Sequence, residues 1–139
     1  PIAPGSSMVV NDGLLYVIGG CKTPIKPETK IQIMNLRNPN PRWETHPIEL
    51  PSCIYDGWKN MGVVIVEGIL YVIGGYTQLS SSRRVYSLDL TNKSSNWKRL
   101  PELGQKRASF YVFYHDGYLY SVGGNERCYK NIERLQINR

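Results

Sequence analysis

The sequence predicts an all-β protein that is built from repeated units of four short strands. Three observations support this fold class. A Tyr-x-x-Gly-Gly motif occurs three times within 139 residues. The strand-like segments around the motif recur at matching distances in each copy. Pro, Gly and β-branched residues interrupt every stretch that is long enough to form a helix.

The repeat is clearest in three segments of ten residues. These segments are residues 11–20, 66–75 and 115–124. Their offsets are 55 and 49 residues, and together they hold nine of the thirteen glycines. A repeat with such a period predicts an array of structurally equivalent units that stack on their neighbours.

Each unit begins with a predicted β-hairpin. The turn pairs are Asp12-Gly13, Glu67-Gly68 and Asp116-Gly117. The short β-rich segments before them are residues 7–10, 61–66 and 109–114. Because Gly accepts a positive φ, an acidic residue followed by Gly between two such segments predicts a type I′ turn. The apolar runs after the turns favour strands that are covered on both faces.

Two further strands are expected in each unit. The third strands are expected at residues 31–36, 85–90 and 132–137. Seven residues after the first two of these segments comes a Trp, which marks a fourth strand, and the sequence ends before a third Trp could follow. The Gly-Gly pairs let the chain turn sharply where a side chain would clash.

This pattern resembles the kelch repeat of β-propellers, which has a period of about 50 residues and four strands per blade. The resemblance is strongest to proteins of the BTB-kelch type. It is carried by Tyr16, Gly19, Gly20, Trp43, Tyr71, Gly74, Gly75, Tyr86, Trp97, Tyr120, Gly123 and Gly124. Gln32 and Glu133 depart from the pattern, because they stand where the middle unit has Tyr86.

The resemblance implies a partial kelch β-propeller of two complete four-stranded blades and most of a third. We expect residues 1–139 to form part of one propeller, with units at about 5–51, 52–106 and 107–139. Since propellers usually have about four to eight blades, the remaining blades are expected elsewhere in the same chain or in a second copy.

Charge is concentrated in the connections between the second and third strands. The net charge is +6, and residues 21–30, 76–84 and 125–131 contribute seven basic and two acidic residues, or +5. Such connections emerge on one face of a propeller. The excess therefore forms either a basic binding face or a set of long loops kept soluble by charge.

By resemblance to BTB-kelch proteins, these connections and those from a fourth strand to the next blade line a substrate-binding face. The residues expected there are Tyr76, Arg83, Arg84, Arg107, Arg127 and Tyr129. Arg binds carboxylates through two parallel hydrogen bonds and Tyr adds amphipathic contact area. The implied function is a protein-interaction module of a substrate adaptor or scaffold, of the ubiquitin-ligase adaptor type, which binds an acidic segment of a partner protein.

A second function stays open at this point. Some kelch-like propellers are enzymes, such as copper-dependent galactose oxidases and sialic acid mutarotases, whose active sites draw residues from several blades. No catalytic residue, metal site or cofactor is expected in this chain. His46 and His115 fall in different units without metal-ligand spacing, and the Gly-Gly pairs lack the pattern of a phosphate-binding loop.

Other classes of partner and location are disfavoured. The basic residues are not interleaved with stacking aromatic residues, so nucleic acid is not an expected partner. No apolar run reaches the length of about 18–20 residues that a membrane helix needs. Cys21, Cys53 and Cys128 have no Cys-x-x-Cys spacing, which favours free thiols in a reducing, cytoplasmic environment.

Overall fold

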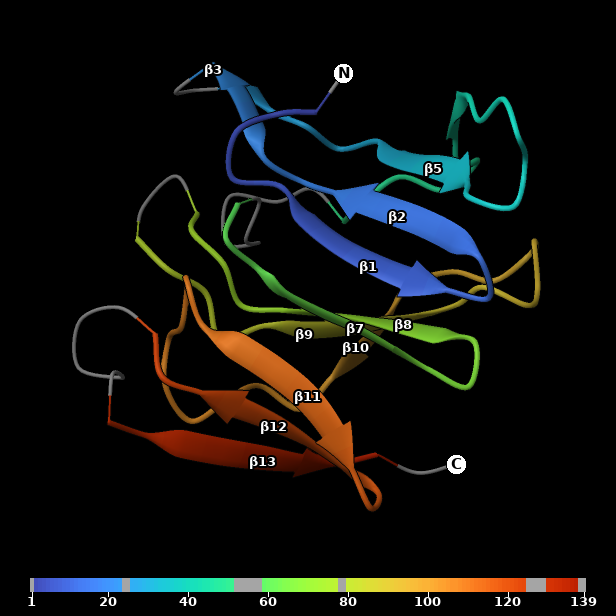
Figure 1. Cartoon of the computed structure of the whole chain (residues 1–139). Helices are drawn as coiled ribbons and strands as arrows, with labels where there is room; N and C mark the ends of the chain where they lie inside the picture. Colours follow the sequence, from blue (N-terminus) through green and yellow to red (C-terminus); the bar gives the residue numbers. More distant parts are fainter. Residues whose placement is uncertain (1, 24–25, 52–58, 78–79, 125–129, 138–139) are drawn as a thin grey trace.

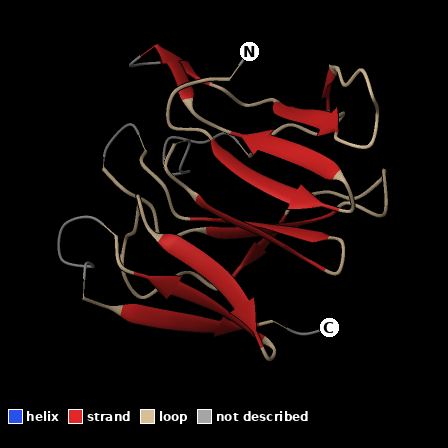
Figure 2. Ribbon diagram, viewed as in Figure 1, coloured by secondary structure: helices blue, strands red, loops and turns tan. Residues whose placement is uncertain are grey.

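The computed structural model describes residues 2–23, 26–51, 59–77, 80–124 and 130–137. Within these ranges all regular secondary structure is β-strand (Figures 1 and 2). Two four-stranded sheets and one three-stranded sheet follow one another along the chain, and a small hairpin is attached to the first. We call the three sheets blade 1, blade 2 and blade 3. The expected all-β array of blades is confirmed.

Each blade is an antiparallel meander. Blade 1 consists of β1 (Ser7–Asn11), β2 (Leu14–Ile18), β5 (Ile31–Asn35) and β6 (Trp43–Thr45). Blade 2 consists of β7 (Gly62–Val66), β8 (Ile69–Ile73), β9 (Val85–Asp89) and β10 (Lys98–Leu100). Blade 3 consists of β11 (Tyr111–His115), β12 (Tyr118–Val122) and β13 (Ile132–Gln136). The small hairpin is β3 (Cys21–Thr23) with β4 (Lys26–Pro27).

The first two strands of every blade are joined by the turn that the sequence predicts. In blade 1 the last paired residues are Asn11 and Leu14, which leaves Asp12 and Gly13 in a two-residue turn. Both turn residues have positive φ, 50° and 76°, as a type I′ turn requires. The acidic residue and Gly of the other two turns also have positive φ. The weaker Glu67-Gly68 signal therefore gives the same geometry as Asp-Gly.

The first strands of blades 2 and 3 begin later than the sequence suggests. Residue 61 precedes β7, and residues 109–110 precede β11. The cause is a left-handed residue two positions before each first strand. Gly5, Asn60 and Ser109 have φ values of 78°, 53° and 54°, which are incompatible with an extended strand.

These left-handed residues link the blades to one another. The Asn60 N–H donates to the Gly5 carbonyl at 2.8 Å, and the Ser109 N–H donates to the Asn60 carbonyl at 2.9 Å. The Asn60 side-chain amide also donates to the Ser109 hydroxyl at 3.0 Å. We call Gly5, Asn60 and Ser109 with these bonds the inter-blade belt. It fixes the distance between the first strands of neighbouring blades.

The hydrophobic core lies between the blades rather than inside any one of them. One cluster joins blade 1 to blade 2 and includes Ile18 and Leu70, both fully buried. A second cluster joins blade 2 to blade 3 and includes Ile73 and Leu119, each 1% exposed. A sheet that is buried on both faces explains why the strands lack polar alternation.

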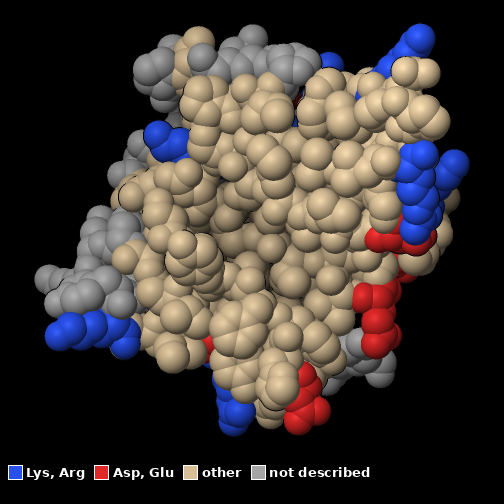
Figure 3. All heavy atoms as spheres, viewed as in Figure 1, with Lys and Arg blue, Asp and Glu red and all other residues tan. Residues whose placement is uncertain are grey.

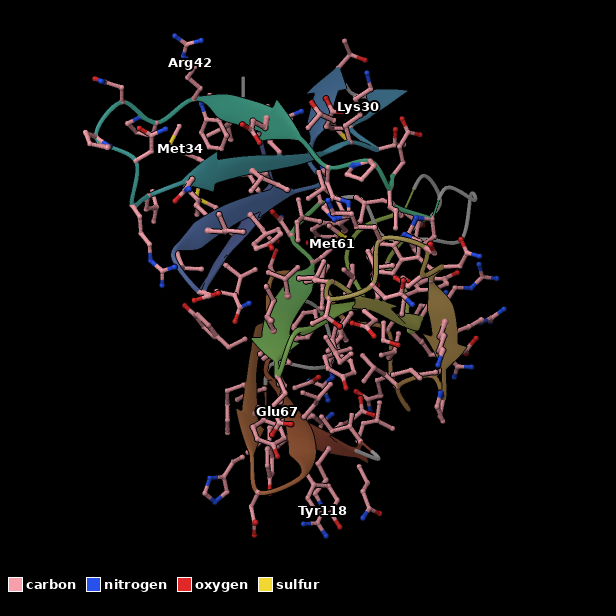
Figure 4. The ribbon with its side chains drawn as sticks, turned by 90° about the vertical axis from the view of Figure 1, so that its right-hand side faces the viewer. Lys30, Met34, Arg42, Met61, Glu67 and Tyr118 are labelled. Carbon is pink, nitrogen blue, oxygen red and sulfur yellow. The ribbon has the colours of Figure 1, made fainter. Side chains whose placement is uncertain are left out.

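The two ends of the stack present apolar side chains to solvent. Met8 and Val10 of blade 1 are 55% and 58% exposed, and Tyr111 and Ile132 of blade 3 are 81% and 66% exposed. In Figure 4, Met34 lies in blade 1 at one end of the stack and Tyr118 lies at the opposite end. At the two boundaries between blades, the equivalent faces are covered by a neighbouring blade.

The connections lie on two opposite sides of the stack. In Figure 1 the connections from the second to the third strands leave on the left, and the hairpin turns lie on the right. Between these sides, the surface facing the viewer carries few charged side chains, and most charges lie along its margins (Figure 3).

Alanine substitution at Gly74 is expected to destabilise the protein far more than alanine at Gly117. A Cβ at Gly74 would lie 2.5 Å from the Arg107 carbonyl oxygen, whereas a Cβ at Gly117 meets nothing within 4 Å. Both residues have positive φ, so each substitution costs about 1–2 kcal/mol of backbone strain. The clash at Gly74 should raise its total cost above about 3 kcal/mol. Urea unfolding measures both, and equal losses would contradict the close packing assigned to Gly74.

Candidate functional site

The connection from β8 to β9 is held by bonds to its own ends. The Ser82 N–H donates to the Gly75 carbonyl at 2.8 Å. Thr77 and Ser80 form a local turn, in which the Thr77 N–H donates to the Ser80 carbonyl at 2.8 Å and the Ser80 N–H donates to the Thr77 hydroxyl at 2.9 Å. The described residues Thr77, Ser80 and Ser82 are therefore held in place by backbone hydrogen bonds.

The connection from blade 2 to blade 3 lies beside it. The Leu103 N–H donates to the Arg83 carbonyl at 2.8 Å, and the Arg107 N–H donates to the Ser82 carbonyl at 3.0 Å. Two segments that are about 20 residues apart thus form one surface. We call this surface the loop site.

The loop site contains a cavity of about 230 Å³. Its lining combines hydroxyl groups with three cationic side chains and one carboxylate. The lining residues are Thr77, Ser80, Ser81, Ser82, Arg83, Arg84, Glu102 and Lys106. The excess of positive charge and the hydroxyl donors suit the binding of an anionic group.

Glu102 neutralises two of the Arg side chains around the site. Its carboxylate accepts a hydrogen bond from Arg99 Nη2 at 2.6 Å and another from Arg83 Nη2 at 3.0 Å. These bonds, first from Arg99 and then from Arg83, lower the pKa of Glu102 below its ordinary value. The Arg83 side chain is 47% exposed, and an exposed ion pair of this kind exchanges readily for another partner.

Lys106 and Arg84 belong to the same site, and hydroxyl groups bind the Lys106 ammonium and the Arg84 backbone. Lys106 Nζ lies 3.4 Å from the Ser80 hydroxyl, and the Arg84 N–H donates to the Ser82 hydroxyl at 3.0 Å. Lys106 is exposed and Arg84 is half-buried. The Ser80 hydroxyl therefore contacts the Lys106 charge, and the Ser82 hydroxyl holds the backbone from which the Arg84 side chain enters the lining of the cavity.

Arg107 does not lie on the exposed loop surface where the sequence placed it. Its side chain is fully buried and its Nε donates to the Glu133 carboxylate at 3.0 Å. Its Nη1 donates to the carbonyls of Gly123 at 2.6 Å and Asn131 at 3.1 Å. Arg107 therefore joins the blade 2 connection to blade 3, because its guanidinium binds a carboxylate and two backbone carbonyls of that blade.

The other expected contact residues fall into two groups. Tyr76 is half-buried beside the loop site, where its N–H donates to the Lys59 carbonyl at 2.9 Å and Lys59 Nζ lies 5.7 Å from its ring centre. Arg127 and Tyr129 lie outside the described residues. The structure thus brings Arg83 and Arg84 together at one cavity with Tyr76 nearby, whereas the Arg107 side chain is buried against blade 3.

The aromatic residues of the repeat lie between blades or at the end of the stack. Tyr16 and Tyr71 are each 5% exposed, and burial raises the pKa of both phenols. Trp97 contacts Tyr86 edge-on, with ring centres 6.4 Å apart. Tyr120 stacks on Phe113 at 5.1 Å. Tyr16, Tyr71 and Tyr120 occupy equivalent strand positions, and only Tyr120 lacks a covering blade among the described residues.

Sequence reasoning missed two members of the loop site. Glu102 and Lys106 are not among the residues expected at the binding face, although Glu102 forms ion pairs with Arg83 and Arg99 beside the cavity. Glu133 was noted as a departure from the Tyr86 pattern, and the structure shows that its carboxylate binds Arg107 and the backbone N–H of Gly104 at 2.5 Å. The signal in the sequence was a carboxylate in the third strand of a blade together with an Arg just before the first strand of the same blade, a combination that can form an ion pair.

Two absences concern the described residues alone. In the part of the chain that the structure describes, no three His, Cys, Asp or Glu side chains come together as a metal site. Within those same ranges, no helix has the length and hydrophobicity needed to cross a membrane.

The contribution of Glu102 to stability should disappear at acidic pH. Because folding lowers its pKa, the carboxylate stabilises the protein above the pKa of the unfolded chain, near about 4.3, and this contribution is lost as pH falls through the lower folded value. Glu102→Gln should therefore lower Tm at pH 7 and differ less from the wild type at about pH 3. Thermal unfolding at both pH values checks this, and an equal Tm at pH 7 would contradict the ion pairs.

Comparison with known proteins assigns the repeat. The family model of the kelch motif matches residues 57–104. An Arabidopsis thaliana protein named as an F-box/kelch-repeat protein is 36% identical over 109 residues, which cover 71% of this chain and 29% of that protein. Kelch-like protein 41a of Danio rerio is 31% identical over 123 residues, which cover 86% of this chain and 18% of that protein.

A solved structure, that of YjhT, matches with a TM-score of 0.69 and 18% identity, over 89% of this chain and 36% of the other. This likeness concerns the fold alone. The chain spans less than a third of the curated relatives described above. Its repeated motif, its meandering blades and these matches together show that the chain belongs to the kelch-repeat family and forms part of a kelch β-propeller.

Proposed function

We propose that this chain is the partner-binding part of a kelch substrate adaptor or scaffold, and that the loop site binds an acidic segment of a protein. The observation that carries the proposal is the cavity of about 230 Å³ with Arg83, Arg84 and Lys106 in its lining. Relatives named as F-box/kelch-repeat and Kelch-like proteins support the adaptor role.

The chemistry of the loop site suits a carboxylate side chain. Arg84 and Lys106 supply positive charge to the lining, which also contains the hydroxyl groups of Thr77 and Ser80. Charge-assisted bonds of this kind are about twice as strong as neutral ones. An incoming carboxylate would also compete with Glu102 for Arg83, at little cost because that pair is exposed.

The position of the site suits a long partner segment. The connections of all three blades leave on the same side of the stack (Figure 1), and Lys30 and Lys130 add exposed positive charges on the equivalent connections of blades 1 and 3. Charges arranged in this way steer an acidic partner toward the face and accelerate association. The cavity would then select where a single acidic side chain is held.

Charge reversal at the cavity should weaken binding of an acidic peptide much more than the same reversal elsewhere. The probe is a fluorescein-labelled deca-glutamate peptide, and the readout is fluorescence anisotropy with the 139-residue chain. Arg84→Glu should raise Kd by at least about tenfold, which corresponds to about 1.4 kcal/mol. Its salt dependence should also become flatter.

Arg42→Glu is the matched control, because it changes the net charge equally. Arg42 is exposed, and Figure 4 shows it on blade 1, in a view of the side away from the loop site. It should change Kd by less than about threefold, since only long-range attraction is affected. Equal weakening by the two variants would reject the loop site in favour of non-specific attraction to a basic protein.

A further inference from the structure

The loop site already holds an anionic group of the chain itself. Glu102 belongs to the lining of the cavity, and its Oε2 accepts a hydrogen bond from Arg83 Nη2 at 3.0 Å. Its Oε1 accepts another from Arg99 Nη2 at 2.6 Å. Arg83 is a lining residue, whereas Arg99 lies in β10, outside the lining. The Glu102 carboxylate is therefore shared between one Arg of the site and one Arg beside it.

The backbone keeps Glu102 next to Arg83. The N–H of Leu103, the residue after Glu102, donates to the Arg83 carbonyl at 2.8 Å. A group tethered in this way competes with an external ligand at an effective concentration of about millimolar or more. Every ligand that uses Arg83 must displace Glu102, so the affinity of each such ligand is lowered by the same factor. Glu102 thus sets a threshold that only a strongly bound ligand exceeds.

Displacement of Glu102 leaves its carboxylate with a partner. When a ligand takes Arg83, the shorter bond from Arg99 to Glu102 can persist. The pair is also accessible, since the side chains of Arg83 and Glu102 are 47% and 33% exposed. The exchange therefore leaves no charge buried and unpaired, which is the condition that makes the breaking of an ion pair costly.

The charge of the lining favours a dianion over a monoanion. Arg83, Arg84 and Lys106 are cationic and Glu102 is anionic, which leaves a net charge of +2. A carboxylate side chain brings a single negative charge. A phosphoserine or phosphothreonine brings about 1.5 to 2 negative charges at pH 7. Of these two kinds of side chain, only the phosphorylated one neutralises the lining.

The arrangement of the cations favours the same ligand. Arg83 and Arg84 come from the connection after β8, and Lys106 comes from the connection that leads to blade 3. A phosphoryl group has three strong acceptor oxygens, and Arg binds phosphate through two parallel hydrogen bonds. One phosphoryl group can therefore contact cations of both connections. The cavity of about 230 Å³ has room for it, because a water molecule takes only about 30 Å³.

We infer that the loop site binds a phosphorylated Ser or Thr side chain of the partner segment in preference to Asp or Glu, and that Glu102 sets the affinity that a ligand must exceed. The inference rests on the proposed function, because it concerns the same site and the same acidic segment. It adds the identity of the side chain that the cavity holds. Capture of the partner then depends on prior phosphorylation of that segment.

Three peptides that differ at one residue test the preference. Each is a fluorescein-labelled peptide of Gly and Ala with phosphoserine, Glu or Ser at its centre, and its binding to the 139-residue chain is measured by fluorescence anisotropy. At about pH 7.5 the phosphoserine peptide should bind at least about tenfold more tightly than the Glu peptide, and the Ser peptide should bind most weakly. At about pH 5 the phosphoryl group keeps little more than one negative charge, so its advantage over Glu should fall below about threefold.

Two variants separate the charge match from the threshold. Lys106→Gln lowers the net charge of the lining to +1 and should reduce the preference for phosphoserine over Glu at least about threefold. Lys106 is exposed, so the fold should tolerate this change. Glu102→Gln removes the competing charge and should tighten the binding of both peptides by a similar factor of at least about three. A purely structural residue would not raise affinity while its loss lowers Tm.

Glu44→Gln is the matched control for Glu102→Gln, because it changes the net charge of the protein equally. Glu44 is exposed in β6 of blade 1. The control should change the Kd of either peptide by less than about twofold, since it acts only through long-range attraction. Equal tightening by the two variants would contradict the role of Glu102 as a competitor.

Inorganic phosphate separates a peptide site from a site for the free ion. It should displace the phosphoserine peptide only at concentrations at least about tenfold above the Kd of that peptide, because the peptide adds contacts outside the cavity. Displacement by inorganic phosphate at a concentration equal to that Kd would overturn the inference in favour of a site for free phosphate.

Equal affinity for the phosphoserine and Glu peptides at about pH 7.5 would also overturn the inference. The proposed function would survive that result if Arg84→Glu still weakened deca-glutamate binding more than Arg42→Glu. Equal weakening of deca-glutamate binding by those two variants would reject the proposed function and the inference together. The two failures are therefore distinguishable.

Discussion

Every blade in this protein depends on a neighbouring blade to cover its apolar face. A sheet of four short strands has two such faces and cannot bury both alone. The inter-blade belt of Gly5, Asn60 and Ser109 sets the spacing at which the faces meet. The left-handed backbone at these residues costs energy for Asn60 and Ser109, and the bonds that it allows between blades offset that cost.

The same constraint places the loop site. Since the blades stack with one spacing, the connection after β8 and the connection that leads to blade 3 meet at Arg83 and Leu103. The Arg107 side chain then joins the second connection to blade 3, through an ion pair with Glu133 and hydrogen bonds to two carbonyls of that blade. The connection that bears Lys106 is thus anchored to blade 3 by the ion pair between the buried Arg107 side chain and Glu133. Removing one partner of such a pair is expected to cost about 3–5 kcal/mol.

Much of the fold could be predicted from the sequence, because its signals are local. The Asp12-Gly13 turn requires two positive φ values, and the short apolar segments can form only strands. Arg107 could not be placed in this way, because it follows Lys106 in a loop and resembles any exposed basic residue. Its burial depends on Glu133, which is 26 residues away and meets it only when blades 2 and 3 stack. The cavity of the loop site was missed for the same reason, since it forms between two connections.

The central claim is that the three blades are held as one unit by the contacts between them. Amide hydrogen exchange of the native chain tests it directly, at the N–H groups of Asn60, Ser109 and Gly75, which bond only across blade boundaries or their connections. The account predicts that these amides exchange as slowly as those of Leu70 and Leu119 in the strands, because opening any boundary requires global unfolding. Rapid exchange at Asn60 and Ser109 beside protected strands would show that the blades are stable separately, and would contradict the account.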